Sequence, residues 1–327
     1  MKIVYSDSAV PVRQSFIASA LGIKNIFRFE IPKQFVEKQL KCVDREGKPV
    51  NTQHRQTVLF RFLYDCSAGN LVLNGITYPC ISKLAGHFLS SSASKALIPS
   101  FIRRNGIDMS EYESQAYSCF NDFFCRNILD GARSIDDTPD AVISPCDGKV
   151  QVFPINEDSS FEIKGISYTI DKLLRSEELA GRFQGGTLVL LRLGVDDYHH
   201  YAYPIDGKQV DYNRINGKLH TVNPYVASRI PIYSENSREY ALIDTENMGN
   251  VLMMEVGALM VGRIVNRIVL GNVSRGQEKG YFKFGASSIV LCFEKGAVIP
   301  DADLIRNSAN GAETVIKLGE HIAVIAK

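Results

Sequence analysis

Apolar residues gather in short continuous runs over the second half of the chain. These runs occupy residues 187–193, 250–256, 288–293 and 321–326, and turn-forming residues, mainly Gly and Asn, separate them. Apolar runs of this length with turn residues on either side predict buried β-strands. We therefore expect a β-rich domain over residues 134–327.

A helical pattern precedes these strands, from about residue 53 to residue 130. Phe120, Phe123 and Phe124 recur at spacings of three and four, which places them on one face of a helix. The segment FIRRNGID (101–108) is typical of a helix end, because two arginines occupy its last turn and a glycine follows them.

The two patterns together predict an α+β protein with an N-terminal helical part packed on a β-rich domain. The boundary lies near residue 134, because SIDDTPDAVISPCDGKV (134–150) is rich in turn formers. We expect residues 1–40 to form an N-terminal extension of unknown role, 41–133 the helical part and 134–327 the β-rich domain. Within the helical part, VDREGKPV (43–50) is typical of a turn between short elements.

Composition and charge exclude few classes of protein. The chain has 327 residues, of which 45% are hydrophobic and 22% charged, as in an ordinary globular protein. The formal net charge of +1 gives no whole-chain attraction to nucleic acid. No segment offers about 20 apolar residues for a membrane span, so any contact with a membrane would be at its surface.

The cysteines give no sign of a disulfide framework or a zinc site. Their number is odd, their spacings are irregular, and no CxxC pair occurs. The N-terminus also lacks an apolar core of signal-peptide length. We interpret the protein as a cytosolic chain in a reducing environment. The seven are Cys42, Cys66, Cys80, Cys119, Cys125, Cys146 and Cys292.

The first segment that could carry chemistry is a pair of serines. Ser287 and Ser288 follow Gly285 and Ala286 at the entrance of the strand run 288–293. One interpretation is a polar turn that leads into a strand. The other is a strained turn of small residues, in which a serine hydroxyl attacks the carbonyl carbon of the preceding residue.

The second segment contains two adjacent histidines. DDYHHYAYPIDG (196–207) follows the strand run 187–193 and includes His199 and His200. A histidine at a strand exit is a candidate general base, because its ordinary pKa is near neutrality. The alternative is a pair of structural or surface histidines. Adjacent strand residues point to opposite faces, so we expect no metal ion between them.

The third segment, ISPCDGKV (143–150), places Asp147 in a turn. Turns of this kind are common, and by itself this one indicates no function. In chain order, Asp147, His199 and Ser287 give one layout for a carboxylate, a base and an activated hydroxyl. A Ser-His-Asp hydrolase would use the same groups, but the chain lacks the GxSxG elbow.

These segments resemble the signatures of the phosphatidylserine decarboxylase family. FGASS (284–288) resembles its Gly-Ser-Thr cleavage motif, which follows an aromatic-Gly stretch. DYHH (197–200) resembles its Asp-Tyr-His-Arg stretch, and SPCDG (144–148) resembles its Ser-Pro-X-Asp-Gly segment. The resemblance spans roughly residues 40–325. Longer runs that share it are FNDFFCRNI (120–128), GKLHTVNP (217–224), ENSREY (235–240) and TENMGNVLMMEVGALMVGRI (245–264).

The resemblance implies a proenzyme that cleaves itself between Ala286 and Ser287. The serine hydroxyl would attack the preceding carbonyl and convert the amide to an ester, and elimination would then split the chain. The products would be a larger chain, 1–286, and a smaller chain, 287–327. The new N-terminal residue would become a covalent pyruvoyl group, the cofactor that forms a Schiff base with the amine of the substrate.

The same resemblance implies the activity and the roles of the site residues. The protein would be a pyruvoyl-dependent carboxy-lyase that converts phosphatidylserine to phosphatidylethanolamine, with its catalytic domain at 134–327. Asp147 and His199 would form the charge relay that activates Ser287. A pyruvoyl carbonyl takes up the negative charge left by decarboxylation, as PLP does in other enzymes, so neither PLP nor a metal is expected.

The chain departs from the family pattern at three positions. Many relatives carry a second histidine where this chain has Ala202, His200 replaces the usual Arg, and Ala286 replaces the usual Gly. Ala has fewer allowed backbone dihedrals than Gly, so we expect self-cleavage to be slow. These departures leave two alternatives open: a pyruvoyl decarboxylase of a soluble amino acid, and an uncleaved, non-catalytic relative that serves as a scaffold.

A lipid substrate implies contact with a membrane surface. Apolar residues alternate with Lys95, Arg103 and Arg104 in LAGHFLSSSASKALIPSFIRR (84–104). This pattern is typical of a segment that lies in a membrane interface, and equally of an ordinary pair of helices packed on the core. Pro99 argues against one continuous helix. We expect a peripheral protein on the cytoplasmic side of the cell membrane, with no nucleic acid partner. Whether it forms a homo-oligomer stays open.

Overall fold

The four strand runs expected from the sequence are all present in the computed structural model. It describes residues 41–50, 86–228, 230–258, 263–267, 270–285 and 287–326. The matching strands are β6 (Thr187–Leu193), β10 (Gly249–Val256), β14 (Ser287–Phe293) and β17 (His321–Ile325). Each lies within one residue of its predicted bounds. The described residues belong to one compact unit, Leu40–Lys327.

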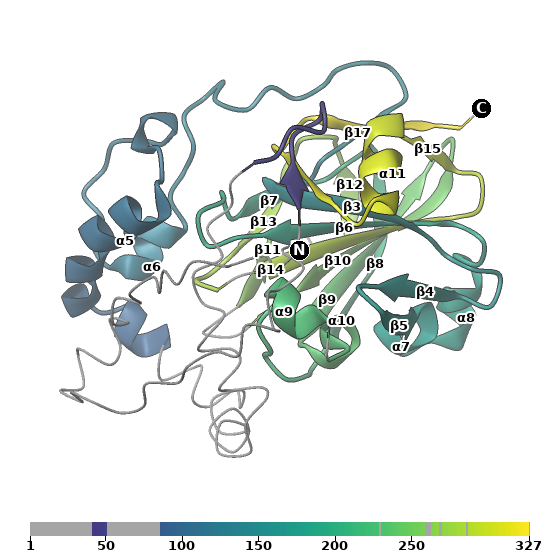
Figure 1. The fold of residues 1–327 in the computed structure, drawn as a ribbon, viewed down its shortest axis with the longest axis horizontal. Coiled ribbons are helices and arrows are strands. Elements are labelled where there is room, and N and C mark those ends of the chain that lie inside the picture. Colours follow the sequence, from purple (N-terminus) through teal and green to yellow (C-terminus); the bar gives the residue numbers. More distant parts are fainter. Residues whose placement is uncertain are drawn as a thin grey trace, which may run out of the picture. The chain divides into compact units, whose positions relative to one another are not determined.

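Nine of the described strands form the main sheet, in the order β1-β16-β3-β6-β14-β10-β9-β8-β12 (Figure 1). Neighbours are antiparallel, apart from the parallel pair β1 and β16. β14 therefore lies inside the sheet, between β6 and β10. The other strands are β1 (Cys42–Val43), β3 (Gly148–Pro154), β8 (Gly207–Ile215), β9 (Arg238–Thr245), β12 (Gly271–Val273) and β16 (Glu313–Ile316).

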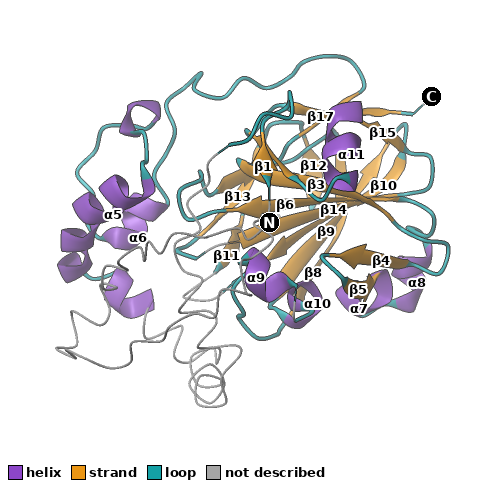
Figure 2. Cartoon of the chain, in the orientation of Figure 1, coloured by secondary structure: helices purple, strands orange, loops and turns teal. Residues whose placement is uncertain are grey.

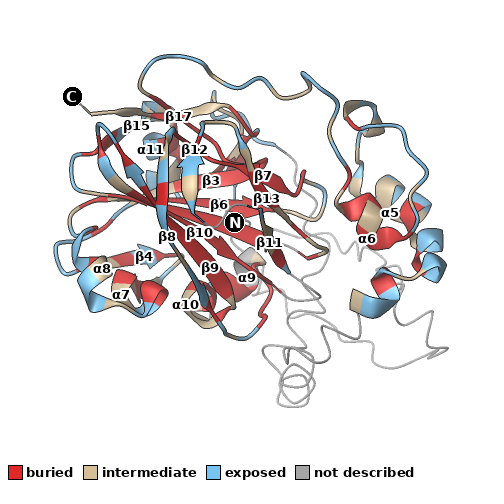
Figure 3. Ribbon diagram, turned by 180° about the vertical axis from the view of Figure 1, so that it is seen from behind, coloured by how far each residue is buried: buried red, intermediate tan, exposed pale blue. Residues whose placement is uncertain are grey.

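Both faces of the main sheet are covered by apolar layers. Successive side chains of β6 enter different layers, with Leu190 in one and Leu191 in the other. The central strands are consequently buried along most of their length (Figure 3). Burial on both faces explains why their sequences are continuous apolar runs instead of alternating patterns.

Smaller elements supply the two covering layers. The hairpin of β4 and β5 with helices α7, α8 and α10 lies on one face, and β2, β7, β11, β13, β15, β17 and α11 lie on the other. The helices are short and surround the sheet (Figure 2). The strands and helices of these two layers are β2 (Ala141–Ile143), β4 (Ser160–Ile163), β5 (Ile166–Thr169), α7 (Ile170–Leu174), α8 (Glu177–Gly181), β7 (His200–Ala202), α9 (Pro224–Ala227), α10 (Ile232–Glu235), β11 (Ile264–Asn266), β13 (Glu278–Phe282), β15 (Val298–Pro300) and α11 (Ala302–Ala309).

The described part of the N-terminal helical region contains a helical stretch at residues 86–89 and four further short helices. These four are η2 (Ser92–Leu97), α5 (Ile98–Asn105), η3 (Met109–Glu111) and α6 (Phe120–Phe124). The predicted helix end is confirmed, since α5 stops at Gly106, whose φ of 63° is the left-handed cap that glycine favours. Phe120, Phe123 and Phe124 are all buried, as their spacing predicts. The long helical stretch predicted from residue 53 is less regular than expected within 86–130.

The α+β class is confirmed, while the predicted domain boundaries stay predictions. Residues 1–40 and 51–85 lie outside the described residues, and so does Ala286. None of the described helices combines the length and apolar character needed to span a bilayer. No disulfide joins the described cysteines, which are Cys42, Cys119, Cys125, Cys146 and Cys292, to one another.

Candidate active site

The sheet topology brings the three predicted site residues to one edge. β3, β6 and β14 are neighbours and alternate in direction, so the start of β3, the end of β6 and the start of β14 coincide. Asp147 directly precedes β3, His199 follows β6 after a short loop, and Ser287 begins β14 opposite Leu193. Gly148 permits the close approach of β3, because a Cβ there would lie 2.7 Å from the carbonyl oxygen of Arg192.

Ser287 is fully buried at the entrance of β14. Its Oγ donates a hydrogen bond to the carbonyl oxygen of Gly285 at 3.1 Å, so the hydroxyl points back along the segment that precedes the strand. Gly285 has a φ of 143°, a backbone conformation that L side chains rarely adopt. A larger residue in this conformation would be strained, so the backbone of Gly285 agrees with the small residues that the sequence places before Ser287.

His199 is a fully buried imidazole with one free nitrogen. Its Nδ1 lies 2.9 Å from the main-chain carbonyl oxygen of Asp197, while its Nε2 has no hydrogen-bond partner among the described residues. Burial lowers the pKa of His199 to about 3, so the ring is neutral near pH 7. The carbonyl requires a proton on Nδ1, which leaves the lone pair on Nε2 available as a base.

The carboxylate of Asp147 is bound by other groups than His199. Arg133 donates to it from Nη2 at 2.6 Å and from Nε at 2.9 Å, and the amide of Leu318 donates at 2.8 Å. Lys317 adds a second cation at 3.6 Å. No hydrogen bond joins Asp147, His199 and Ser287 to one another in the described part of the uncleaved chain, so the charge relay stays a prediction.

Asp197 is the residue whose backbone fixes the orientation of His199. Its carboxylate accepts hydrogen bonds from Lys149 Nζ at 2.7 Å and from the amide of Gly194 at 2.6 Å. Burial opposes the charge, but the ammonium of Lys149 and these hydrogen bonds outweigh it and lower the pKa of Asp197. The loop between β6 and His199 is thus anchored to β3 by an ion pair.

An aromatic cluster holds the segment that precedes Ser287. The ring of Phe284 contacts Phe101, Phe120 and Phe124 edge-on, with centroids 6.3, 5.0 and 4.9 Å away. Phe124 also packs against the ring of His199 at 4.2 Å. Helix α6 therefore contacts both the candidate base and the segment of the predicted cleavage site, and helix α5 contacts that segment.

His200 has different surroundings from His199. Its Nδ1 lies 2.8 Å from Glu278 Oε1, and its Nε2 lies 3.1 Å from the carbonyl oxygen of Cys125. Its ring stacks between Tyr198 and Tyr281, with centroids 5.0 and 5.1 Å away. Among the residues that the structure describes, no group of His, Cys, Asp and Glu side chains could hold a metal ion.

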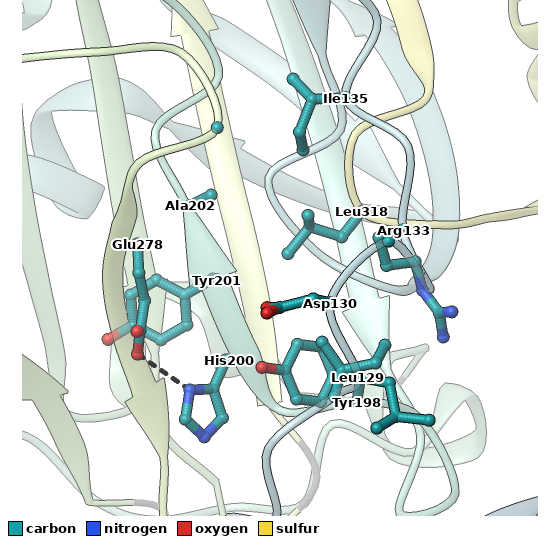
Figure 4. A pocket seen from close by; sticks show the side chains of 13 residues that line it. Leu129, Asp130, Arg133, Ile135, Tyr198, His200, Tyr201, Ala202, Glu278 and Leu318 are labelled. Carbon is teal, nitrogen blue, oxygen red and sulfur yellow. Dashed lines mark hydrogen bonds and ion pairs between the residues drawn. The ribbon is translucent and has the colours of Figure 1, made fainter. Parts of the chain in front are cut away.

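A cavity of about 200 Å³ opens beside His200 (Figure 4). The dashed line in that view marks the contact from His200 to Glu278, and Ala202 lines the same cavity. Ala202 is the position at which many relatives would carry a second histidine. The side chain that is absent from this chain would therefore have faced this cavity.

The sequence motifs do not single out three cationic side chains near the candidate active site, which are Arg126, Arg133 and Lys149. Each lies within or next to a quoted motif, but only the folded chain places Arg133 against Asp147 and Lys149 against Asp197. Arg126 follows α6 inside FNDFFCRNI. The sequence around a buried arginine carries no periodic pattern that distinguishes it from an arginine exposed to solvent.

Comparison with known proteins agrees with the motifs. The family model for phosphatidylserine decarboxylase matches residues 120–324. Phosphatidylserine decarboxylase proenzyme 2 of Clostridium acetobutylicum is 43% identical over 263 residues, which cover 80% of this chain and 90% of that relative. The proenzymes of Fusobacterium nucleatum and Ruminiclostridium cellulolyticum are 39% and 38% identical, over 80% and 81% of this chain and 89% and 90% of their own lengths. The chain therefore belongs to the phosphatidylserine decarboxylase family.

Proposed function

We propose that this chain is the proenzyme of a phosphatidylserine decarboxylase, which forms phosphatidylethanolamine with a pyruvoyl group made from Ser287. The observation that carries the proposal is the sheet edge at which Ser287 and His199 are both buried. There Ser287 begins β14 after a glycine with positive φ, and the neutral His199 keeps an Nε2 without a partner among the described residues. Family membership supplies the reaction, and this edge supplies the groups that self-cleavage needs.

Self-cleavage begins with the hydroxyl of Ser287. His199 Nε2 accepts the hydroxyl proton, Oγ attacks the carbonyl carbon of Ala286, and the bond from that carbon to the nitrogen of Ser287 breaks. The products are an ester and a free amine. Loss of the α-proton of Ser287 then breaks the bond between Cβ and Oγ and releases the carboxylate of Ala286. Water finally replaces the nitrogen, which leaves as ammonia.

The residues around Ser287 fit a pyruvoyl group. It would form at the first residue of an interior strand, where every side chain of β14 is buried and bulk water is excluded. Once formed, the group supplies an electrophilic carbonyl that draws the electron pair left by departing CO2. Because His199 is neutral, it can accept protons at this edge, while Lys149 and Asp197 hold its loop in place.

We also propose that the protein binds peripherally to the cytoplasmic side of the cell membrane, where it would meet a lipid substrate. The segment 86–104 supports this, because Phe88 is 53% exposed and Lys95, Arg103 and Arg104 are exposed as well. The opposite side of this segment packs on the aromatic cluster.

Flotation with anionic liposomes tests the proposed membrane binding. The variant Phe88→Ser/Arg103→Gln/Arg104→Gln should float less than the wild type. Absence of wild-type binding would overturn the proposal.

The central test combines intact mass with a decarboxylase assay. Under denaturing conditions the purified protein should give two chains split at 286/287, with a pyruvoyl mass at the new N-terminus. The variants Ser287→Ala and His199→Gln should stay intact. Labelled CO2 should be released from phosphatidylserine and not from free serine. An intact, inactive wild-type chain would refute the proposal, and release from free serine alone would assign a soluble substrate.

A further inference from the structure

Arg126 is a fully buried arginine with no counter-ion among the residues that the structure describes. Its guanidinium lies 4.1 Å from the ring centroid of Tyr112 and 5.0 Å from that of Phe123. Its one hydrogen bond is a long contact of 3.5 Å, from Nη2 to the carbonyl oxygen of Asp196. The Nε and Nη1 donors have no partner among the described residues.

Other buried arginines of the described chain are fully engaged. Arg192 pairs with Glu313, and Arg133 pairs with Asp147. Arg238 donates to the carbonyl oxygens of Leu173, Lys172, Ser234 and Asn236. A buried charge with unsatisfied donors is strongly unfavourable, so native structures complete such donors with ordered water, an ion or a ligand.

Arg126 lies next to the candidate active site. Tyr112 and Asp196, which it contacts, line a cavity of about 210 Å³ together with Asp147 and Asp197. Phe124, two residues before Arg126 in the chain, packs against His199. Of the five carboxylates that line this cavity, Asp147 and Glu111 bind Arg133, Asp197 binds Lys149, and Asp108 and Asp196 are exposed to solvent. Arg126 itself is fully buried and is not among the residues that line the cavity, so an anion from outside the chain reaches its unpartnered donors only after neighbouring side chains move.

We propose that Arg126 binds the phosphodiester of the substrate headgroup, an inference that rests on the proposed function. A guanidinium presents Nε with Nη2, or Nη1 with Nη2, as a paired fork that matches two oxygens of a phosphate, and Nη2 of Arg126 is held only by its long contact with Asp196. In phosphatidylserine, one methylene and one oxygen join the reacting carbon to the phosphorus. An anion site close to His199 would therefore fix the reacting carbon near Ser287.

The chemistry of the reaction favours the phosphodiester over the carboxylate as the bound anion. The carboxylate loses its charge as CO2 leaves, so an arginine bound to it would stabilise the ground state more than the transition state. The phosphodiester keeps its charge throughout. Binding it stabilises substrate and transition state equally, which lowers KM and leaves kcat unchanged.

The test compares kinetics of the self-cleaved enzymes. Arg126→Gln should raise KM for phosphatidylserine in mixed vesicles at least tenfold and change kcat less than threefold. Arg126→Lys, which keeps the charge but loses the fork, should raise KM by a smaller factor. Arg306→Gln, at an exposed position of α11, is the matched control and should match wild type. Intact mass confirms that each variant folds and cleaves itself.

Soluble competitors identify the anion. Glycerophosphoethanolamine carries the phosphodiester without the carboxylate, and free serine carries the carboxylate without the phosphodiester. Arg126→Gln should raise the inhibition constant of the first at least tenfold and leave that of serine unchanged. Glycerophosphoethanolamine should also bind wild type more tightly than inorganic phosphate; the reverse order would assign the site to free phosphate and overturn a headgroup site.

Failure of this inference is distinguishable from failure of the proposed function. An active wild type with unchanged KM in Arg126→Gln, or a selective loss of serine inhibition, refutes only the phosphodiester site. If Arg126→Gln does not cleave itself, Arg126→Lys decides the question by the same measurements. A wild type that neither cleaves nor decarboxylates refutes the function itself.

Discussion

At the scale of single residues, the protonation of His199 links the site to the stability of the chain. Its pKa is about 3 in the folded protein and near 6.5 in an unfolded chain. Between these values the unfolded state binds more protons, so the free energy of unfolding falls as the pH falls. One proton contributes a slope of at most about 1.4 kcal/mol per pH unit.

Urea unfolding at pH 7.5, 6.5, 5.5 and 4.5 tests this slope. The Ser287→Ala chain should lose stability toward low pH, and Ser287→Ala/His199→Gln should lose less. The uncleavable background keeps unfolding within one chain. The pKa of His220 is also lowered by burial, but it titrates alike in both proteins and cancels in the difference. Parallel curves would mean that His199 is solvated.

The sequence predicts the three site residues but not their contacts. Asp147, His199 and Ser287 can be chosen because each stands in a motif of polar and small residues. That Asp147 binds Arg133, and that His199 keeps a free Nε2, depends on the packing of segments far apart in the chain. Hydrogen-bond partners of buried groups are set by tertiary structure, which no local pattern encodes.

At the scale of elements, the contact of Phe284 with α5 and α6 should position the cleavage segment. Each aromatic pair contributes about 0.5–1.5 kcal/mol beyond its buried area. Phe284→Ala removes three such contacts and should slow self-cleavage about tenfold, which corresponds to about 1.4 kcal/mol in the barrier.

Intact mass at intervals after synthesis measures the rate of self-cleavage. Phe284→Leu, which refills much of the space, should cleave faster than Phe284→Ala. Phe88→Ala changes an exposed phenylalanine of the same region and should cleave at the wild-type rate. Equal rates for Phe284→Ala and wild type would show that the aromatic cluster only stabilises the fold.

A buried ion pair joins the sheet of β13 to the main sheet. Lys279 Nζ lies 2.8 Å from Glu255 Oε1 of β10 and 2.8 Å from Asn266 Oδ1, and both charged side chains are fully buried. Lys279→Met would leave the carboxylate of Glu255 buried and unpaired, and should lower the free energy of unfolding by about 3–5 kcal/mol.

Urea unfolding in the Ser287→Ala background measures this loss. Lys295→Met breaks an exposed pair with Glu157 and is the control, with an expected change below about 1 kcal/mol. Adding Glu255→Gln to Lys279→Met should recover part of the stability, because it removes the unpaired charge. A loss of the same size at both lysines would mean that the interior pair is hydrated.

The sequence predicts four of the described strands closely, and the remaining strands, the helices and the pairing less well. Strands buried on both faces leave a continuous apolar signal, so their bounds can be predicted to within a residue. Helices of five to eight residues, such as α6 and α5, contain too few turns for a clear periodicity. The order of strands joins segments far apart in the chain, such as β3 and β16, and leaves no local trace.

At the scale of the whole molecule, the two predicted chains should remain together after cleavage. The smaller chain, 287–327, contains β14, which pairs with β6 on one side and β10 on the other. Every residue of β14 is buried. Native gel filtration should give one peak that contains both chains, and a denaturing gel of that peak should separate them. Release of the smaller chain in native buffer would contradict this prediction.

Because β14 lies inside the sheet, the ease of folding depends on whether the chain folds before or after cleavage. In the uncleaved chain, this strand reaches β6 and β10 within one molecule, and closing the intervening loops does not depend on concentration. After cleavage it would have to return from a separate polypeptide, so refolding becomes bimolecular and competes with aggregation. The mature protein would then stay folded because it unfolds slowly. Thermal unfolding would be irreversible, since only the uncleaved precursor refolds within one chain.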